Sequence, residues 1–530
     1  MVLQKNAVLA PFLSDRLSFI RGLDPLGLQN TSQAAFSYLL PGLNNVTGRI
    51  RYYSFYCWLL DAYAQVSGST NPEDQKRFIR RAELIVALVA CYAEEEIGTT
   101  IGTRYAGGMA QKQPEGPFDL ESNTFKKDGS TEHTYWKYPT GGFGQYYLGS
   151  LRDIGIIVER EEGSGVFVRS KPKGEEQVSG EELAHAFEES VPEAVRFQFL
   201  KVIKIGQLTV DDIYELLPFF RMDKIAENSL EQDLLIRLLI HQDYPNQISE
   251  HPSTLRRQTI KHLLDFAANT TEDVSSETFI INAYQQKGIV NGEEDECLTG
   301  WYYYQLNEYW QFGCLAVLNG ALQYLEALAG PGWWPINDLL ETLIIELEKA
   351  LLSEFDLENQ NCKLGKFLSI IEEKIEEESV LFVLNSIEII QATNGFTLAL
   401  KACWANQSEL ERLIRYGRKS DIVRDGDVVS WAKRLPVFLE QSLSVFLRNF
   451  LWKDILQRHQ LVAYRKMNAG QSTQKFILEE QRIRLLGTFP PGFTGPRINR
   501  MLSFLFDLHL LDEEYRPTAL GSKILNQIKS

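Results

Sequence analysis

Apolar residues recur along most of this chain at the spacing of an α-helix. Between residues 72 and 96, for example, apolar side chains follow one another three or four positions apart, at Phe78, Ala82, Ile85, Leu88 and Tyr92. The same spacing predicts further helices at 33–40, 48–66, 233–241, 253–268, 301–328 and 336–353. The stretch 98–130 is rich in glycine, proline and lysine and predicts loop or extended structure instead. A mainly α-helical protein is therefore expected.

One interruption of the helical pattern lies between residues 144 and 187. An amphipathic helix at 144–154 is followed by two short β-prone runs, 156–160 and 166–170, on either side of a Glu-Glu-Gly-Ser-Gly turn. The sequence Ser179-Gly-Glu-Glu then forms a capping box that starts another helix. Helix, hairpin and capped helix follow one another in the order of a winged-helix module.

A second interruption lies at the C-terminal end of the chain. A helix is predicted at 496–511, a short extended element at 514–516, and a final helix at 519–528 capped by Thr518. This order predicts a second winged-helix module with a minimal wing. The expected fold class is therefore mainly α, a multi-domain helical protein with two small winged-helix (α+β) modules.

The length of the chain also predicts several domains, because 530 residues exceed what one hydrophobic core supports. The changes in pattern suggest four segments. These are an N-terminal helical domain (1–130), a winged-helix-like module (131–190), a helical middle domain (191–400) and a basic C-terminal domain that ends in a winged-helix-like module (401–530).

Charge is distributed unevenly along these segments. The whole chain has a net charge of −16, yet residues 401–530 contain 21 Lys and Arg against 13 Asp and Glu. A basic end attached to an acidic body indicates contact with a polyanion or an acidic partner. Contact between the basic and acidic parts of the chain itself is the alternative.

Six cations of the basic segment are predicted to bind DNA phosphates. Arg497 and Arg500 lie on the polar side of the predicted helix 496–511, and four more lie upstream near Tyr464: Arg465, Lys466, Arg482 and Arg484. Basic residues interspersed with aromatic ones suit a phosphate backbone. The alternatives are a solvated basic face and an acidic protein partner. The first winged-helix module carries an acidic wing, which favours protein docking over DNA contact.

The common signatures of enzymes are missing from the sequence. It contains no GxxxxGK[ST], HExxH or GxSxG motif and no CxxC pair. The glycine-rich loop around Arg104 matches no known phosphate-binding spacing. We therefore assign no catalytic residue, no metal ligand and no cofactor, and expect a protein that is not an enzyme. A loosely patterned nuclease centre, for which Glu354, Asp356 and Lys363 are candidates, stays open.

Other features indicate the cytoplasm as the location. The six cysteines are scattered through the chain, as expected of free thiols in a reducing compartment. The first residues lack the basic and apolar segments of a secretory signal. No run of 18 apolar residues predicts a membrane span.

The most distinctive segment is LPGLNNVTGRIRYYSFYCWLLD, which starts at residue 39. Thr47 is predicted to cap a helix over 48–66, so that Arg49 and Arg51 lie in its first turn. Cations there oppose the positive end of the helix dipole and need a compensating anion. Carboxylates, with Glu83 and Glu94 to Glu96 as the expected partners of these arginines and of Arg80 and Arg81, are the favoured choice. A bound phosphate is the alternative.

This segment resembles a signature of uncharacterised bacterial proteins encoded in phage-defence islands, LPG-x4-T-x-R-x-RYY-x-F-x2-W. The matching positions are Pro41, Gly42, Thr47, Arg49, Arg51, Tyr52, Tyr53, Phe55 and Trp58. Genes of this kind accompany an SMC- or ABC-type ATPase and a nuclease effector, as in Lamassu-like systems.

The resemblance implies a non-enzymatic accessory subunit that docks the ATPase or the nuclease effector and contacts double-stranded DNA through its basic C-terminal part. A metal-dependent nuclease effector and a pure protein scaffold are the alternatives. No membrane partner is expected.

Overall fold

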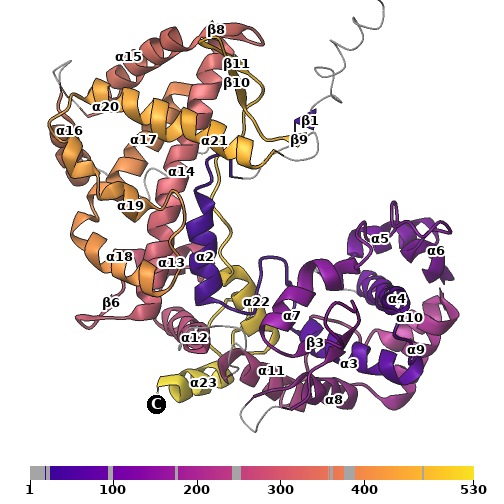
Figure 1. Cartoon of the computed structure of the whole chain (residues 1–530). Coiled ribbons are helices and arrows are strands. Elements are labelled where there is room, and N and C mark those ends of the chain that lie inside the picture. The colour runs from indigo at the N-terminus through magenta and orange to yellow at the C-terminus, as the bar shows by residue number, and fades with distance from the viewer. Residues whose placement is uncertain are drawn as a thin grey trace, which may run out of the picture. The chain divides into compact units, whose positions relative to one another are not determined.

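The computed structural model describes residues 18–19, 24–93, 100–172, 177–241, 252–355, 357, 362–374, 388–467 and 471–529. It is mainly helical (63% helix) and contains a few small sheets of two or three strands (Figure 1). The predicted mainly α class is confirmed.

The chain divides into two compact units, each built from stretches that are far apart in the sequence. The first unit combines residues 1–36 with 283–494, and the second combines 37–282 with 495–530. The expected middle segment 191–400 is thus divided between the two units after residue 282.

The core of the first unit is α14 (Glu296–Ala329), which begins where the Asp295 side chain accepts a hydrogen bond from the Leu298 amide at 2.8 Å. The helix carries apolar and aromatic side chains on all of its faces, and it is buried over most of its length. Its length and composition would also suit a membrane span, but 67% of that apolar window is buried within the structure. We therefore describe α14 as a central core helix.

The neighbouring helix α17 (Glu388–Trp404) lies against α14 at very short range. The contact is made by glycines: a Cβ atom on Gly313 would lie 2.6 Å from the carbonyl oxygen of Gly395, and one on Gly320 would lie 2.5 Å from that of Glu388. Small residues at these positions are therefore required for the two backbones to approach.

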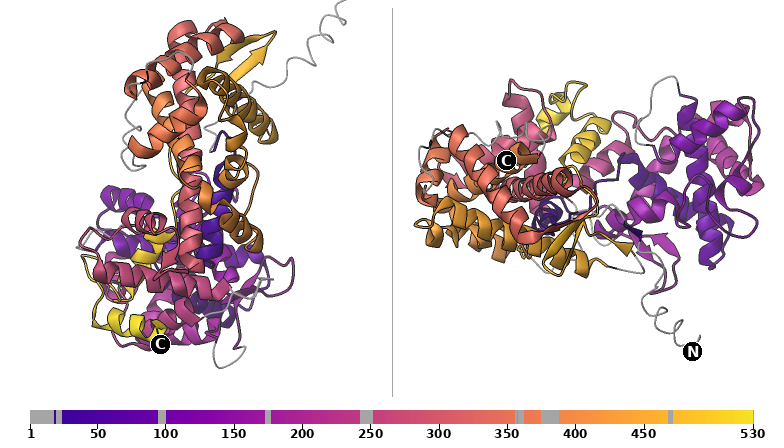
Figure 2. Two further views of the ribbon diagram at one scale, coloured as in Figure 1. Left: turned by 90° about the vertical axis from the view of Figure 1, so that its left-hand side faces the viewer. Right: turned by 90° about the horizontal axis from the view of Figure 1, so that it is seen from above.

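The other elements of the first unit surround this pair of helices. They are α15 (Ile336–Glu354), α16 (Leu364–Lys374), α18 (Leu410–Lys419), α19 (Val428–Ala432), α20 (Leu443–Asn449), the π-helix η5 (Phe450–Gln457) and α21 (Arg458–Arg465). The strands β8 (Trp333–Pro335), β11 (Arg482–Leu485) and β10 (Phe476–Glu479) form an antiparallel sheet in the order β10–β11–β8. Figure 2 shows this sheet near the C-terminal end of α14.

Two smaller pairs of strands also belong to the first unit. Strand β1 (Ser18–Phe19) runs parallel to β9 (Gln471–Ser472), and β6 (Ile289–Val290) forms a hairpin with β7 (Glu293–Glu294). Helices α2 (Gln29–Leu39) and α13 (Ser276–Gln285) each cross a boundary between the units in the sequence.

The second unit is centred on α3 (Arg51–Val66), most of whose residues are buried. The rings of Phe55 and Trp58 on this helix pack against Phe187, Phe199 and Phe220, and the last two stack with their centroids 4.1 Å apart. The surrounding helices are α4 (Pro72–Cys91), α8 (Gly180–Ser190), α9 (Glu193–Ile205), α10 (Val210–Leu216), α11 (Leu230–His241) and α12 (Pro252–Asn269). Strands β2 (Phe118–Asp119) and β5 (Gln207–Leu208) pair antiparallel.

The segments of both predicted winged-helix modules lie in this unit, but only the first contains a hairpin. The first comprises the π-helix η1 (Phe143–Tyr147) and α7 (Leu148–Asp153), the hairpin of β3 (Ile157–Glu159) and β4 (Phe167–Arg169), and α8 with its capping box. The second comprises α22 (Ile498–Asp507), a single bridge between Leu511 and Pro517, and α23 (Ala519–Lys529). Thr518 accepts a hydrogen bond from the Gly521 amide at 3.1 Å, as expected of a cap.

Two local predictions are wrong. The stretch 98–130 was expected to lack helices, but it contains α5 (Thr103–Lys112) and α6 (Leu120–Thr124), because Gly102 and Asp119 supply the turns that start them. Helix α3 begins at Arg51 rather than Gly48. Thr47 is not its cap, because the Thr47 amide donates to the Asn44 side chain at 2.8 Å in a separate turn.

Candidate functional site

The arginines of the signature segment are held by buried carboxylates of the second unit. Arg49 contacts Asp507 at 2.6 Å, and Asp507 is 2% exposed. The Arg51 Nε lies 3.2 Å from Glu231, and its Nη1 donates to the backbone carbonyls of Phe219 and Arg221, both at 2.8 Å. The compensating anions are thus carboxylates, as favoured from the sequence, but they come from other helices than expected.

The expected partners have different roles. Glu83 accepts hydrogen bonds from Tyr56 at 2.8 Å and from the Phe143 amide at 2.6 Å, and burial raises its pKa. Arg80 donates to the backbone carbonyls of Thr124 and Trp136. Arg81 forms an ion pair with Glu121. Glu94, Glu95 and Glu96 lie outside the described residues.

The remaining signature residues form the turn before α3 and the first residues of this helix. Gly42 adopts a left-handed conformation with φ of +76°, and its carbonyl accepts a hydrogen bond from Tyr53 at 2.9 Å. The Pro41 carbonyl accepts one from Arg256 at 2.8 Å. The Tyr52 ring lies 4.7 Å from that of Tyr147. These contacts explain the segment as a structural element of the second unit.

Two of the six predicted DNA-binding cations lie at the end of α21 and contact aspartates. Arg465 contacts Asp425 at 3.1 Å, and the Lys466 amine donates to the backbone carbonyl of Asp24 at 2.7 Å. Partial burial by itself would raise the pKa of Asp425, but Arg458 and Arg465 together lower it. The positive charges of Arg465 and Lys466 are therefore partly neutralised by contacts within the first unit.

Arg482 and Arg484 are both exposed and lie on one face of the three-stranded sheet. Side chains alternate along a strand, and Ile483 between them is 1% exposed on the opposite face. In the register of the sheet, Arg484 lies between Trp333 of β8 and Ile477 of β10. Glu479 is opposite Arg482 and offsets part of its charge.

Arg497 and Arg500 lie at the start of α22, in the second unit. The Arg497 side chain donates to the Leu40 carbonyl at 3.1 Å and to the Ser37 hydroxyl at 3.0 Å. These hydrogen bonds fix the side chain within the second unit. The Arg500 Nε donates to the Asn45 carbonyl at 2.8 Å. The six predicted cations are therefore divided between the two units.

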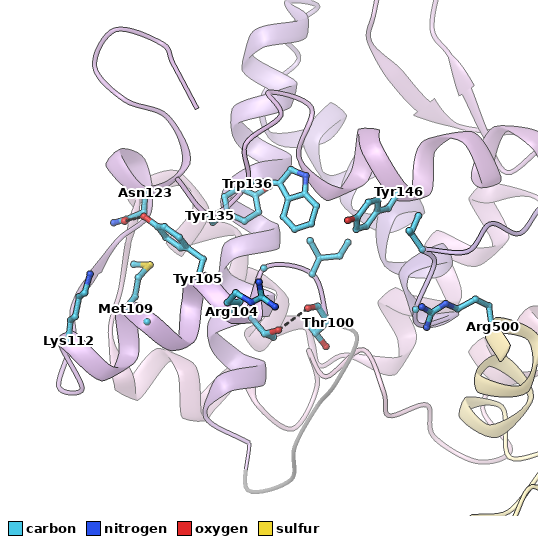
Figure 3. Close-up of a pocket in the computed structure, with 16 residues that line it drawn as sticks. Thr100, Arg104, Tyr105, Met109, Lys112, Asn123, Tyr135, Trp136, Tyr146 and Arg500 are labelled. Atoms are coloured by element: carbon cyan, nitrogen blue, oxygen red, sulfur yellow. Dashed lines mark hydrogen bonds between the residues drawn. The ribbon is translucent and has the colours of Figure 1, made fainter. Parts of the chain in front are cut away.

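A cavity of about 900 Å³ lies in the second unit, and Arg500 is the only one of its lining residues that the sequence predicts as a binding residue, for DNA. Figure 3 shows Arg104, Trp136 and Tyr146 around one opening, with Lys112 and Arg500 at opposite ends. The glycine-rich loop around Arg104 was the one feature of the sequence that pointed to this cavity. The loop alone could not predict the cavity, because residues far away in the sequence complete its wall.

The described residues include no group of three or more His, Cys, Asp or Glu side chains that is arranged to hold a metal ion. Of the three candidate nuclease residues, Asp356 lies outside the described part of the chain, and Lys363 forms an ion pair with Glu440. Burial raises the pKa of the Cys57, Cys314 and Cys403 thiols well above the ordinary value. These three thiols are packing residues.

Comparisons with protein-family models, with curated proteins and with solved structures find no match to this chain.

Proposed function

We propose that this protein is a non-enzymatic accessory subunit of a bacterial anti-phage complex and that it contacts double-stranded DNA through its first unit. It docks an SMC- or ABC-type ATPase or a nuclease effector. The observation that carries the DNA contact is the pair of exposed arginines, Arg482 and Arg484, on the solvent face of the β10–β11–β8 sheet.

The sheet face has the chemistry of a phosphate contact. Guanidinium groups bind phosphate oxygens through two parallel hydrogen bonds. Within the described residues, neither of these two arginine side chains forms a hydrogen bond or an ion pair. Trp333 beside Arg484 is 36% exposed and offers an indole ring next to the charge. Arg484 lies between Ile477 and Trp333, so no acidic side chain beside it in the sheet offsets its charge. We therefore expect Arg484 to bind a DNA phosphate more strongly than Arg482 does.

The other four predicted cations have secondary roles in this proposal, and one of them, Arg500, donates its Nε–H to the Asn45 carbonyl. Arg465 and Lys466 share their charge with aspartates of the same unit, and Arg497 is engaged with Ser37 and a backbone carbonyl. Of the six cations predicted from the sequence, we therefore propose only Arg482 and Arg484 as the main DNA-binding residues.

The segment from η1 to α8 and the segment from α22 to α23 act as winged-helix modules in this proposal, the second with a wing reduced to one bridge. The wing of the first, between β3 and β4, carries the exposed acidic residues Glu161 and Glu162 and repels a phosphate backbone. It therefore docks a protein partner. Its capped helix α8 packs on α3, so the signature segment supports this docking module from inside.

The DNA contact is tested with a double charge reversal, Arg482→Glu with Arg484→Glu, in the full chain. A matched control reverses Arg415 and Arg418, two exposed arginines of α18 in the same unit. Fluorescence anisotropy with a short DNA duplex at low salt should show affinity lowered about tenfold or more by the sheet variant and little changed by the control. Equal losses in both variants would overturn the assignment to the sheet.

The same titration separates the alternatives. Absence of duplex binding by the wild-type chain would leave only the scaffold function, and cleavage of the duplex after addition of magnesium would favour a nuclease. Co-purification of an ATPase or nuclease subunit from the native host, retained after DNA digestion, is the expected result for docking.

A further inference from the structure

We propose that the cavity in the second unit binds a nucleoside phosphate. Its walls come from three parts of that unit: the signature loop at Val46 and Gly48, the segment from Thr100 to Lys112 that includes α5, and Trp136 with Tyr146 near η1. Arg500 of α22 completes it (Figure 3). A volume of about 900 Å³ is within the range of small-molecule sites.

The charge of the lining selects an anion. Arg104, Lys112 and Arg500 line the cavity, and none of its lining residues is acidic. Arg104 and Lys112 are exposed, and their side chains form no hydrogen bond or ion pair with any described residue. Arg500 uses its Nε for the Asn45 carbonyl. Three cations around one hollow, in a chain with a net charge of −16, mark a local reversal of potential.

The start of α5 adds donors for phosphate oxygens. This ten-residue helix begins after Gly102, which has a φ of +83° and provides no side-chain cap. The amides of Thr103 and Arg104 belong to the first turn and have no partner within the helix. Thr103 and Arg104 line the same cavity as Lys112 and Arg500, and the positive end of the helix dipole there favours a phosphate group.

The aromatic lining selects the other part of the ligand. Trp136 and Tyr146 stand edge to face with centroids 5.2 Å apart, and Tyr105 and Tyr135 lie along the same wall. The polar tips of Trp136 and Tyr105 are already bonded, to Gln145 at 2.8 Å and to Asn123 at 2.6 Å. These bonds fix the rings in place as stacking surfaces for a planar base. A base with phosphate attached matches both halves of the cavity.

The proposal is tested by isothermal titration calorimetry of the full chain with ATP and with GTP. At least one should bind, and Arg104→Gln combined with Lys112→Gln should weaken binding about tenfold or more, since each removes a charge-assisted contact. The matched control is Lys171→Gln, an exposed lysine of the same unit outside the cavity, which should bind as the wild type does. Circular dichroism checks that each variant is folded.

Tripolyphosphate distinguishes the base from the phosphate. It should bind more weakly than the nucleotide, and Trp136→Ala should lower nucleotide affinity toward the tripolyphosphate value. No measurable binding of ATP or GTP, unchanged affinity in the Arg104 and Lys112 variant, or equal affinity for tripolyphosphate would each overturn the proposal. DNA binding through Arg482 and Arg484 is independent of these outcomes, because the cavity variants leave the sheet intact.

Discussion

Glu308 is a carboxyl group that lies inside the first unit with only neutral neighbours as hydrogen-bond donors. It is 1% exposed, and it accepts hydrogen bonds from the Thr494 amide at 2.6 Å and the Gln311 side chain at 3.3 Å. Its second oxygen has no partner in good hydrogen-bonding geometry among the described residues, although the Ser32 hydroxyl interacts with the same carboxyl group. Burial therefore raises the pKa of Glu308 to about 7, although these hydrogen bonds partly oppose the shift.

This raised pKa predicts a pH-dependent contribution to stability. The folded chain keeps a proton on Glu308 that the unfolded chain releases near pH 4.5, so the contribution is complete below pH 4.5 and is lost as the pH rises to about 7. The loss amounts to roughly 3 kcal/mol. Glu308→Gln imitates the protonated carboxyl group at every pH, so this substitution should remove the pH dependence of stability that Glu308 causes.

The measurement is denaturant unfolding of the wild type and the variant at several pH values. The free energy of unfolding of the variant relative to the wild type should increase between pH 4.5 and 7. A constant difference over this range would show that Glu308 is ionised in the folded chain.

At the scale of elements, the pairing of α14 with α17 depends on two glycines, seven residues apart on α14, that face the backbone of α17. A helix interior normally disfavours glycine by about 1 kcal/mol relative to alanine. Here the close approach reverses this preference, because any Cβ atom at these positions would meet a carbonyl oxygen or the Ala399 or Ala392 side chain within 3 Å.

Gly313→Ala should therefore destabilise the first unit, by about 2 kcal/mol, since α14 and α17 have to move apart. Gly149→Ala is the matched control, because Gly149 also lies in a helix but has no atom within 4 Å of the added methyl group. The control should be neutral or slightly stabilised. Thermal unfolding followed by circular dichroism compares the two, and equal midpoints would contradict the steric explanation.

Most helices could be predicted from their periodicity, and the reasons for the failures are local. The predicted helix 301–328 corresponds to α14, and 336–353 corresponds to α15. Helix α5 was missed because Gly107 and Gly108 in its middle are typical of loops, whereas in the structure the helix packs against α4. The start of α3 was misplaced because Asn44, not Thr47, organises the preceding turn.

At the scale of the whole molecule, the sequence showed that positive charge concentrates after residue 400, but not how the fold uses it. The ion pairs of Arg465 and Arg49 connect residues that are 40 and 458 positions apart. Contacts at such separations have no signal in local spacing. For the same reason the cavity, which unites Val46, Arg104 and Arg500, could not be assembled from the sequence.

The proposed DNA contact makes a quantitative prediction about salt. Each neutralised phosphate contributes about −0.9 to the slope of log affinity against log salt concentration. Two arginines should give a slope of about −2, whereas the six cations expected from the sequence would give about −5. Anisotropy titrations of the wild-type chain over a range of salt concentrations measure this slope. The steeper value would mean that further cations reach the DNA.

The interleaved composition of the two units determines when each becomes complete during synthesis on the ribosome. The second unit lacks α22 until residues 495–530 emerge, and until then Arg49 has no Asp507 to neutralise it. The first unit in turn needs everything up to residue 494. The second unit of the nascent polypeptide is thus incomplete until residues 495–530 have been synthesised. A premature stop codon shortly before α22 would release a product whose second unit lacks this helix and has an exposed core.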